Sequence, residues 1–377
     1  MKENFIIFLL SMFSLSSFSQ EIGKELLSSP VLLERDSNKL SIRLDATAFF
    51  KNNEYFNPIA KGETFPGMRI IPTVRYQLHD KFLFEVGTNT LFYSGNDDVS
   101  VKLHTRLQYS PIPEFSFVMG NYYGGVNHRL IEPLYQRENH LVEAPESGVQ
   151  LIYNNGKYFA DIWLDWERFI HPGDDFQEAL TFGISTSACL TSKESRLKVS
   201  IPLQLLIHHE GGQIDTSEEE MIIVGNLAAG VNLEYEISRD RFIKSMGLSA
   251  YWLGYYDKKP NAAIRPYEKG WAVYPILHIN ASPFEFQAGY WHADKFFAYG
   301  GEPLFASFSL LYPDSQLPER NLITAKLSYS KKLLRTLRIG IYAETYTDMD
   351  RNKTDYSFGV NLRFTPRLFN WLISGNH

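Results

Sequence analysis

Residues 99–109 read Val-Ser-Val-Lys-Leu-His-Thr-Arg-Leu-Gln-Tyr, so that every second side chain is apolar or tolerates an apolar environment. The side chains between them are polar or charged. Because successive side chains of a strand point to opposite faces of its sheet, this stretch predicts a β-strand with one apolar and one charged face. The same alternation recurs over residues 40–50, 197–207 and 356–364.

Two architectures produce strands of this kind. A soluble β-sandwich or solenoid buries the apolar faces against each other, whereas a transmembrane β-barrel turns them toward lipid. Short connections such as 79–80 and 154–156 alternate along the chain with longer ones such as 124–147 and 294–320. Barrels have short periplasmic turns and longer extracellular loops, so this alternation favours the barrel. Aromatic residues also cluster near the predicted strand ends, as expected at the two membrane interfaces.

We therefore predict an all-β fold, a transmembrane antiparallel β-barrel of about sixteen strands. The predicted strands are 40–52, 65–78, 81–93, 99–109, 114–123, 148–154, 157–167, 178–190, 196–207, 221–237, 242–256, 270–281, 284–293, 321–330, 336–347 and 354–365. Residues 303–312 alternate weakly as well, but counting them gives an odd number of strands. Bacterial single-chain barrels have even numbers, so we place 303–312 inside the loop 294–320. The alternative is an eighteen-stranded barrel with one more strand.

The two ends of the chain lie outside the predicted barrel, which spans 39–365. Residues 1–19 combine a basic start, an apolar run and small residues before Gln20, the pattern of a secretory signal peptide. Residues 20–38 are then a periplasmic N-terminal segment, and 366–377 are a C-terminal periplasmic extension. These features place the protein in the outer membrane of a Gram-negative bacterium, as a multi-pass barrel that is exported by its signal peptide.

Composition excludes several classes of protein. The chain of 377 residues has 22 tyrosines, 27 phenylalanines and 6 tryptophans, too many apolar rings for a disordered protein. A single cysteine excludes a disulfide framework and a Cys-rich zinc module. The net charge of −6 offers no basic excess for nucleic acid. The partners that we expect are outer-membrane lipid and lipopolysaccharide and small hydrophilic solutes, with room left for a homo-oligomer.

At the level of architecture, the chain resembles bacterial outer-membrane porins. The resemblance covers the predicted barrel and rests on the leader segment, the alternating strands and the alternation of turns and loops. The strand that ends at Phe364 is similar to the terminal strand of such barrels, although thirteen residues follow it. The resemblance implies a channel for small hydrophilic solutes, because the lumen of a sixteen-stranded barrel is too wide for side chains to fill unless a loop plugs it.

Strand parity identifies the side chains that face this lumen. The predicted basic wall comprises Arg43, Arg69, Arg75, Lys102, Arg106, Lys326, Arg338 and Arg363, and the other predicted pore-lining residues are Asp161, Asp165, Glu167, Trp163 and Trp291. The loop 124–147 is predicted to constrict the pore with Glu132, Glu138, Glu143 and Glu146. Charged side chains around a pore select ions, so this basic lining favours anions. Aromatic side chains beside charged groups would also suit the passage of oligosaccharides.

Two other functions stay open. If the loops 124–147 and 294–320 plug the lumen, the protein is a binding or docking protein for a surface glycan or partner. A hydrolase at the barrel rim would use residues such as His128, His140 or His208, but no nucleophile stands in a recognisable setting. We therefore expect that the protein is not an enzyme, with no catalytic residue. We also expect no cofactor and no metal site, because the adjacent His208 and His209 point to opposite faces of a strand.

Overall fold

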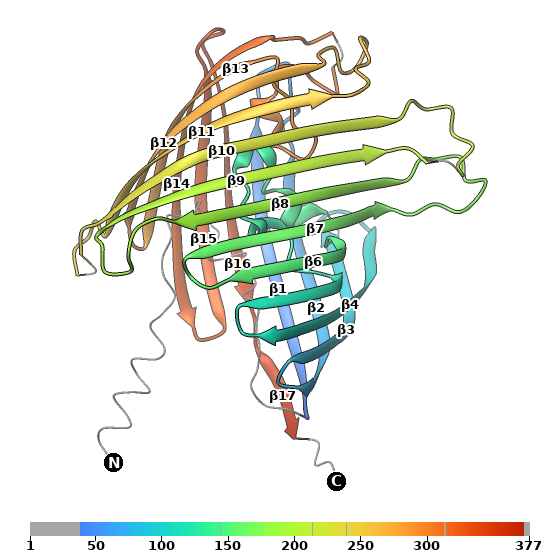
Figure 1. The fold of residues 1–377 in the computed structure, drawn as a ribbon, viewed down its shortest axis with the longest axis vertical. Helices are drawn as coiled ribbons and strands as arrows, with labels where there is room; N and C mark the ends of the chain where they lie inside the picture. Colours follow the sequence, from blue (N-terminus) through green and yellow to red (C-terminus); the bar gives the residue numbers. More distant parts are fainter. Residues whose placement is uncertain (1–37, 144, 213, 239, 313, 373–377) are drawn as a thin grey trace.

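In the computed structural model, residues 38–372 are described except for 144, 213, 239 and 313, and they form one closed antiparallel β-barrel (Figure 1). Its strands are β1 (Lys39–Glu54), β2 (Thr64–His79), β3 (Phe82–Tyr93), β4 (Val99–Ile112), β5 (Phe115–Asn121), β6 (Ser147–Asn154), β7 (Tyr158–Arg168), β8 (Ala179–Cys189), β9 (Leu197–Glu210), β10 (Ile222–Glu236), β11 (Ser245–Asp257), β12 (Lys269–Ala281), β13 (Phe284–Asp294), β14 (Glu319–Leu334), β15 (Leu337–Asp348), β16 (Lys353–Phe364) and β17 (Arg367–Leu372). Each strand from β1 to β16 pairs with its neighbours in chain order, which confirms the predicted fold class.

The barrel closes where β1 meets the end of the chain. One edge of β1 pairs with β2, and the other edge pairs with β16 over 46–54 and with β17 over 39–43. β16 and β17 therefore occupy the same position in the wall, one after the other along the edge of β1, and the barrel has the predicted sixteen strand positions. The wall runs beyond residue 365, where we had placed its end, because β17 stays hydrogen-bonded to β1. The predicted signal peptide lies outside the described residues.

The connections also follow the predicted alternation. Turns such as 80–81 and 335–336 lie at the end of the barrel where the described chain starts and finishes, and the long loops lie at the opposite end (Figure 1). Residues 303–312 lie inside the loop 295–318, as predicted, and contain only the short helix η3 (Pro303–Phe305). No helix among the described residues is long and apolar enough to span a membrane.

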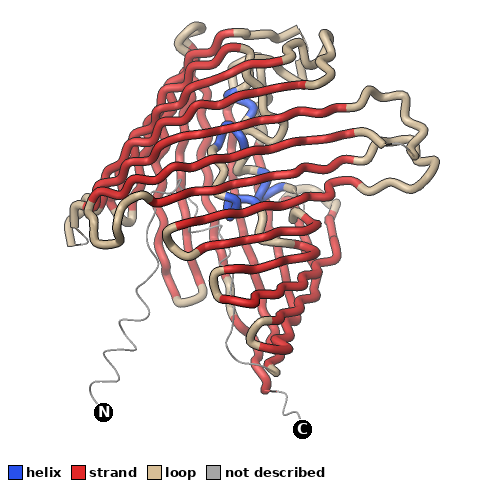
Figure 2. Tube along the Cα trace, in the orientation of Figure 1, coloured by secondary structure: helices blue, strands red, loops and turns tan. Residues whose placement is uncertain are grey.

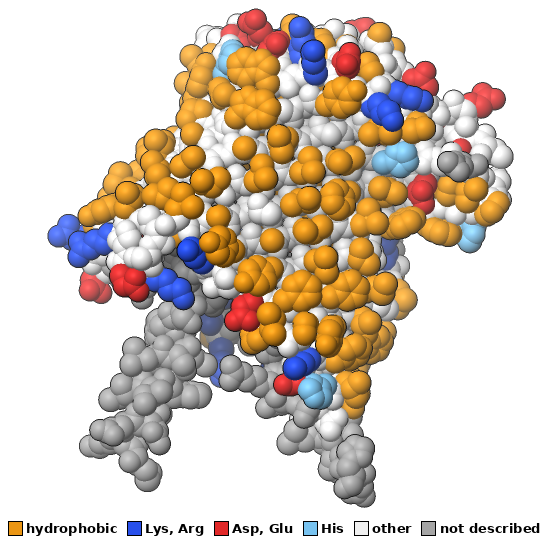
Figure 3. Space-filling view, viewed as in Figure 1, with side chains coloured by type: hydrophobic (Ala, Val, Ile, Leu, Met, Phe, Trp, Pro, Cys, Tyr) orange, Lys and Arg blue, Asp and Glu red, His pale blue; other side chains and the backbone are white. Residues whose placement is uncertain are grey.

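The outer surface of the barrel carries the apolar side of each strand. On β4, Val99, Val101 and Leu103 are all more than half exposed, whereas His104 and Gln108 are buried toward the lumen. Figure 3 shows hydrophobic side chains spread over the outer face of the strands. Apolar side chains on this surface can contact lipid. Lipid cannot hydrogen-bond to backbone N–H and C=O groups, and in a closed sheet these groups bond to neighbouring strands instead.

Two long loops fold into the lumen. The first, 122–146, contains η1 (Gly125–His128), η2 (Glu132–Leu134) and α3 (Asn139–Val142), and the second is 295–318. Figure 2 shows these helices within the outline of the barrel. Their apolar side chains pack with inward rings of the wall into a buried core that includes Leu130, Ile131, Leu134, Phe296, Phe297, Leu304, Phe305, Phe308, Trp163, Trp291 and Tyr346.

The two loops also contact each other. Gln136 N donates to Gly300 O at 2.8 Å, and Glu302 N donates to Glu132 O at 3.1 Å. A Cβ atom at Gly301 would lie 2.1 Å from Pro133 O, so only glycine allows the backbones to approach this closely. The two loops therefore form one body inside the barrel.

Candidate active site

Of the eight predicted pore-lining cations, three contact carboxylates of the wall and two contact the loop 122–146. Arg75 Nε lies 2.6 Å and Arg106 Nη1 lies 2.9 Å from the carboxylate of Glu85. Arg363 Nε lies 3.0 Å from Asp45 Oδ1. The remaining wall cations are Arg43, which is half-buried, and Lys102 and Arg338, which are exposed. These groups sit in a balanced, hydrogen-bonded wall rather than in a row of isolated positive charges.

Two further cations of this set hold the loop 122–146. Lys326 pairs with Glu132 and lies 3.9 Å from Glu344. Arg69 Nη2 donates to Leu141 O at 3.1 Å. Because both cations point inward from the wall, each fixes one part of the loop against the barrel.

The four glutamates that we placed on a constriction loop have different surroundings. Besides the pairing of Glu132 with Lys326, Glu138 lies 2.8 Å from Lys51 Nζ, and Glu146 contacts His128. Glu143 is exposed. Three of the four glutamates therefore hold the loop in place.

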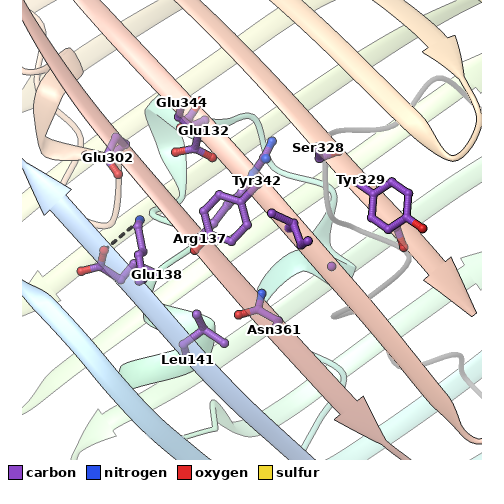
Figure 4. Close-up of a pocket in the computed structure, with 14 residues that line it drawn as sticks. Glu132, Arg137, Glu138, Leu141, Glu302, Ser328, Tyr329, Tyr342, Glu344 and Asn361 are labelled. Carbon is purple, nitrogen blue, oxygen red and sulfur yellow. Dashed lines mark ion pairs between the residues drawn. The ribbon is translucent and has the colours of Figure 1, made fainter. Parts of the chain in front are cut away.

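A small cavity of about 50 Å³ lies between the two in-folded loops, 122–146 and 295–318, and the strands β14 to β16 (Figure 4). Glu132, Glu138, Glu302 and Glu344 line it together with Lys51. Burial raises the pKa of Glu302 to about 8; Lys51 opposes this shift, and the neighbouring glutamates reinforce it. The cavity has room for water only. We interpret this cluster as an electrostatic contact between loops and wall, because a reaction centre needs a nucleophile and room for a substrate.

His128 is the centre of a second cluster, on η1. Its Nδ1 lies 2.8 Å from Asp161 Oδ2, and its Nε2 lies 2.6 Å from Glu146 Oε2. Its ring stacks on Trp163, with centroids 3.6 Å apart. Burial alone would lower the pKa of His128, but the two carboxylates raise it to about 10. Both nitrogens are occupied and the side chain is 1% exposed, so this histidine is a charged link between loop and wall.

His208 is the centre of a third cluster, where β8 and β9 end at the long loops. Its Nδ1 lies 2.9 Å from Thr181 Oγ1, and its Nε2 lies 3.1 Å from Glu210 Oε1. Thr181 Oγ1 also donates to Glu167 Oε1 at 2.5 Å. Thr181 and His208 are register partners on neighbouring strands, which fixes the distance between the hydroxyl and the ring.

A β-bulge completes this third cluster. The pairing of β7 with β8 shifts register between Trp166 and Arg168, so Glu167 is the extra residue. A bulge can turn successive side chains toward one face of the sheet. Glu167 therefore reaches Thr181, while Arg168 Nη2 lies 3.4 Å from Glu210 Oε2. Both side chains are partly exposed, so the cluster is open at the rim.

The second in-folded loop contributes Tyr299 to the same cluster. Its ring stacks on His208, with centroids 3.5 Å apart and an angle of 13° between the planes. Its hydroxyl donates to Glu210. Burial raises the pKa of Tyr299, and the contact with Glu210 raises it further, so the hydroxyl stays protonated. The loop therefore sets the orientation of the His208 ring.

This arrangement of a hydroxyl, an imidazole and a carboxylate is the geometry of an activated nucleophile. From the sequence we had weighed His208 as a metal ligand or rim group, Glu210 only as a metal ligand beside it, and Glu167 only as a pore-lining residue; Thr181 and Tyr299 were missed. Parity already places Thr181 and His208 on the inner face at the loop ends of adjacent strands. No signal in the sequence places Tyr299, which comes from a loop 89 residues after Glu210.

Solved structures similar to this fold are outer-membrane porins. The match to OprD of Pseudomonas aeruginosa has a TM-score of 0.53 at 7% identity and covers 87% of this chain and 94% of the OprD chain. A BenF-like porin from Pseudomonas fluorescens has a TM-score of 0.53 at 8% identity, over 87% and 99%. OccK2 of Pseudomonas aeruginosa, solved in complex with glucuronate, has 0.51 at 8% identity, over 88% and 98%. At such identities the likeness confirms the outer-membrane barrel fold alone.

Comparison with protein families gives a different result. The model of the family described as lipid A 3'-O-deacylase-type matches residues 32–371, nearly all of the barrel. This match contradicts our prediction that the protein is not an enzyme, since the family is one of enzymes. We made that prediction because no nucleophile in the sequence stands in a recognisable local motif. A comparison with curated protein sequences gave no match.

Proposed function

Because the chain belongs to the lipid A 3'-O-deacylase-type family, we propose that it is an outer-membrane hydrolase that removes an O-linked acyl chain from lipid A or a similar acylated glycolipid. The observation that carries the proposal is the relay in which Thr181 Oγ1 lies 2.9 Å from His208 Nδ1 and His208 Nε2 lies 3.1 Å from Glu210 Oε1. The relay lies at the ends of β8 and β9 that lead into long loops, the side expected to face the outer leaflet.

In the first step, the Thr181 hydroxyl hydrogen turns from Glu167 toward His208 Nδ1. The hydroxyl oxygen attacks the carbonyl carbon of the ester, and its proton passes to Nδ1. The bond between that carbon and the sugar oxygen breaks, and the sugar oxygen takes the proton from His208. The products of this step are the deacylated glycolipid and an acyl ester of Thr181.

In the second step, water attacks the acyl ester and gives its proton to His208, which returns it to Thr181. The free fatty acid then leaves. Glu210 accepts the hydrogen bond from His208 Nε2 and stabilises the charged ring. Tyr299 stacks on the imidazole and keeps it oriented toward Glu210. Arg168 brings a positive charge to the rim, where the carbonyl oxygen becomes negative.

Thr181→Val tests the nucleophile, because valine keeps the shape of threonine and removes the hydroxyl. Purified protein is incubated with lipopolysaccharide in detergent, and mass spectrometry follows the loss of one acyl chain from lipid A. The wild type should release fatty acid, and Thr181→Val should lose at least 10²-fold in rate.

Thr186→Val is the matched control, because Thr186 lies on the same strand and its Oγ1 donates to Leu203 O, away from His208. This control should keep wild-type activity. Equal activity of Thr181→Val and the wild type would exclude Thr181 as the nucleophile. A wild type that leaves the acyl chains intact would remove the proposal itself.

The solute channel that we expected from the sequence is the weaker candidate. It is supported by the barrel fold, but an apolar core formed by both in-folded loops occupies the lumen. Conductance across a planar bilayer tests the channel directly. Steady pores from the wild-type protein, with no release of fatty acid, would favour the channel over the hydrolase.

A further inference from the structure

Two rim loops beside the proposed active site are joined into one unit, which we call the flap. The flap comprises residues 169–178 after β7 and residues 211–212 and 214–221 after β9. Gly173 N donates to Ile214 O at 2.9 Å, and Thr216 N donates to Asp174 O at 2.8 Å. Because the two loops are hydrogen-bonded backbone to backbone, they form a single unit at the long-loop end of β7 to β10.

The flap exposes large apolar side chains. Phe169 is 62% exposed and Ile214 is 48% exposed, and Phe176 and Met221 are also exposed. Trp166, at the end of β7 beside the flap, is exposed as well. The outer face of the strands that lead to the loops also carries hydrophobic side chains (Figure 3). A contiguous exposed apolar surface of this kind marks a binding surface.

The charges of the flap restrict what binds there. Its exposed acidic residues are Asp175, Glu218, Glu219 and Glu220. Carboxylates repel an anionic headgroup, so the flap is suited to the uncharged part of a lipid. The acyl chain is the part of a lipid that is both apolar and continuous with the surface already in contact with the bilayer.

The end of β7 connects the flap to the proposed active site. Trp166 faces outward and pairs with Leu180, while its chain neighbour Glu167 contacts Thr181 on the inner side. Arg168 Nε bonds to the backbone oxygen of Gln177, which ties the flap to the site. A chain lying along the flap would therefore bring its ester end to the rim beside Thr181.

We propose that the flap is the surface along which the acyl chain of an outer-leaflet lipid enters the proposed active site. This inference rests on the proposed function and narrows it, because it makes the substrate a lipid embedded in the membrane. A short-chain ester dissolved in water would reach Thr181 without using the flap.

The activity test compares two substrates. One is lipopolysaccharide in phospholipid vesicles, and the other is p-nitrophenyl butyrate in solution. Replacing both Phe169 and Ile214 by serine should lower the rate on the vesicles at least tenfold and leave the rate on the soluble ester within twofold, because each lost apolar side chain removes contact with the acyl chain. The matched control is Phe242→Ser, since Phe242 is 68% exposed but lies in a short turn at the other end of the barrel.

The outcomes separate the two proposals. An equal rate on vesicles for the double variant and the wild type, or an equal fall on both substrates, would overturn the role of the flap. A wild type that hydrolyses neither substrate would instead remove the proposed function, and a measurement of binding alone then decides the flap.

That measurement uses Phe169→Trp in vesicles of phosphatidylcholine with brominated acyl chains. If the flap lies against acyl chains, the added tryptophan should lose fluorescence relative to vesicles without bromine, by more than the wild-type protein does. An added tryptophan that is not quenched would overturn the inference, whatever the activity.

Discussion

His128 and His208 have neighbours of almost the same kinds, but the proposed function gives them different roles. Each imidazole stacks on an aromatic ring, Trp163 for His128 and Tyr299 for His208, at centroid distances of 3.6 and 3.5 Å. Each contacts more than one carboxylate. The difference lies at Nδ1. His128 Nδ1 lies 2.8 Å from a carboxylate oxygen of Asp161, whereas His208 Nδ1 lies 2.9 Å from the hydroxyl of Thr181, with the carboxylate of Glu167 farther away at 3.6 Å.

That difference separates a structural contact from a chemical one. A histidine between two carboxylates is held as a cation, and it has no acceptor nitrogen left for a proton. A histidine between a hydroxyl and a carboxylate can take the hydroxyl proton and be stabilised while it carries the charge. The pair shows that a carboxylate beside a histidine does not by itself identify an active site.

The largest expected effect is on hydrolysis by paired histidine variants. His208→Gln should lower the rate of acyl release by about 10²–10⁴-fold, the contribution of a general acid–base group. His128→Gln should stay within about tenfold of the wild type, and His209→Gln should be unchanged. His209 is a suitable control because it neighbours His208 in sequence and its Nε2 contacts the backbone oxygen of Gly211 instead. Mass spectrometry of the lipid product measures all three, and the reverse ranking would assign the chemistry to His128.

The second expected effect is on stability, and here the variant at His128 should have the larger effect and the variant at His208 the smaller one. His128→Ala leaves the buried carboxylate of Asp161 with the amide of Gln150 but without its charged partner, and should cost about 3–5 kcal/mol. His208→Ala should cost less, since Glu167 and Thr181 are partly exposed to water. Unfolding by urea in lipid vesicles measures both. Adding Glu146→Gln to His128→Ala should restore part of the loss by removing one unpaired charge, and no restoration would contradict the pairing.

The third prediction concerns pH and the docking of the loop 122–146. The pKa of His128 is raised to about 10 from the ordinary 6.5, so its contribution is complete below pH 6.5 and falls as the pH rises to about 10. The protection factors of the loop amides, which are exchange rates corrected for the intrinsic pH dependence of amide exchange, should therefore fall over this range in the wild type. His128→Gln should remove most of that dependence.

Glu302 titrates over an overlapping range and provides the control. Because its pKa is raised to about 8, its ionisation destabilises the loops between about pH 4.5 and pH 8. Glu302→Gln should flatten only this lower part of the profile. A loop whose exchange has the same pH dependence in all three proteins would contradict the role of both groups.

The smallest expected effect comes from Tyr299→Phe. Phenylalanine keeps the ring on His208 and removes the hydroxyl bond to Glu210, which should lower the catalytic rate by about tenfold at most. Tyr299→Leu, which also removes the stack, should lower it further. A shift in the pH profile of hydrolysis with little change in KM would identify Tyr299 as a positioning residue, whereas an unchanged profile would leave it as packing only.

The fold could be predicted from the sequence because strand parity is a local property. Alternation over 99–109 placed the outer face of β4, and the odd-numbered lumen residues of β7 were assigned in the same way. Loop lengths located the rim. The end of the barrel was missed by one strand, since β17 follows a break at Thr365-Pro366 and its pairing with β1 joins residues more than 300 positions apart.

The contents of the lumen could be predicted only in outline. Glu132, Glu138 and Glu146 were recognised as loop charges, but their partners Lys326, Lys51 and His128 depend on how the loop folds. A loop of this length has many conformations, and its final one is chosen by packing against the opposite wall.

By itself, the amino-acid sequence determined the barrel, its sixteen wall positions and which side chains face lipid, because a period of two acts between neighbouring residues. The tertiary structure alone decided that the two loops bond to each other inside the lumen, that a bulge turns Glu167 and Arg168 toward one site, and that Tyr299 covers His208. Those contacts join residues from separate strands and loops, and they form only when the sheet closes and brings distant segments within a few ångströms.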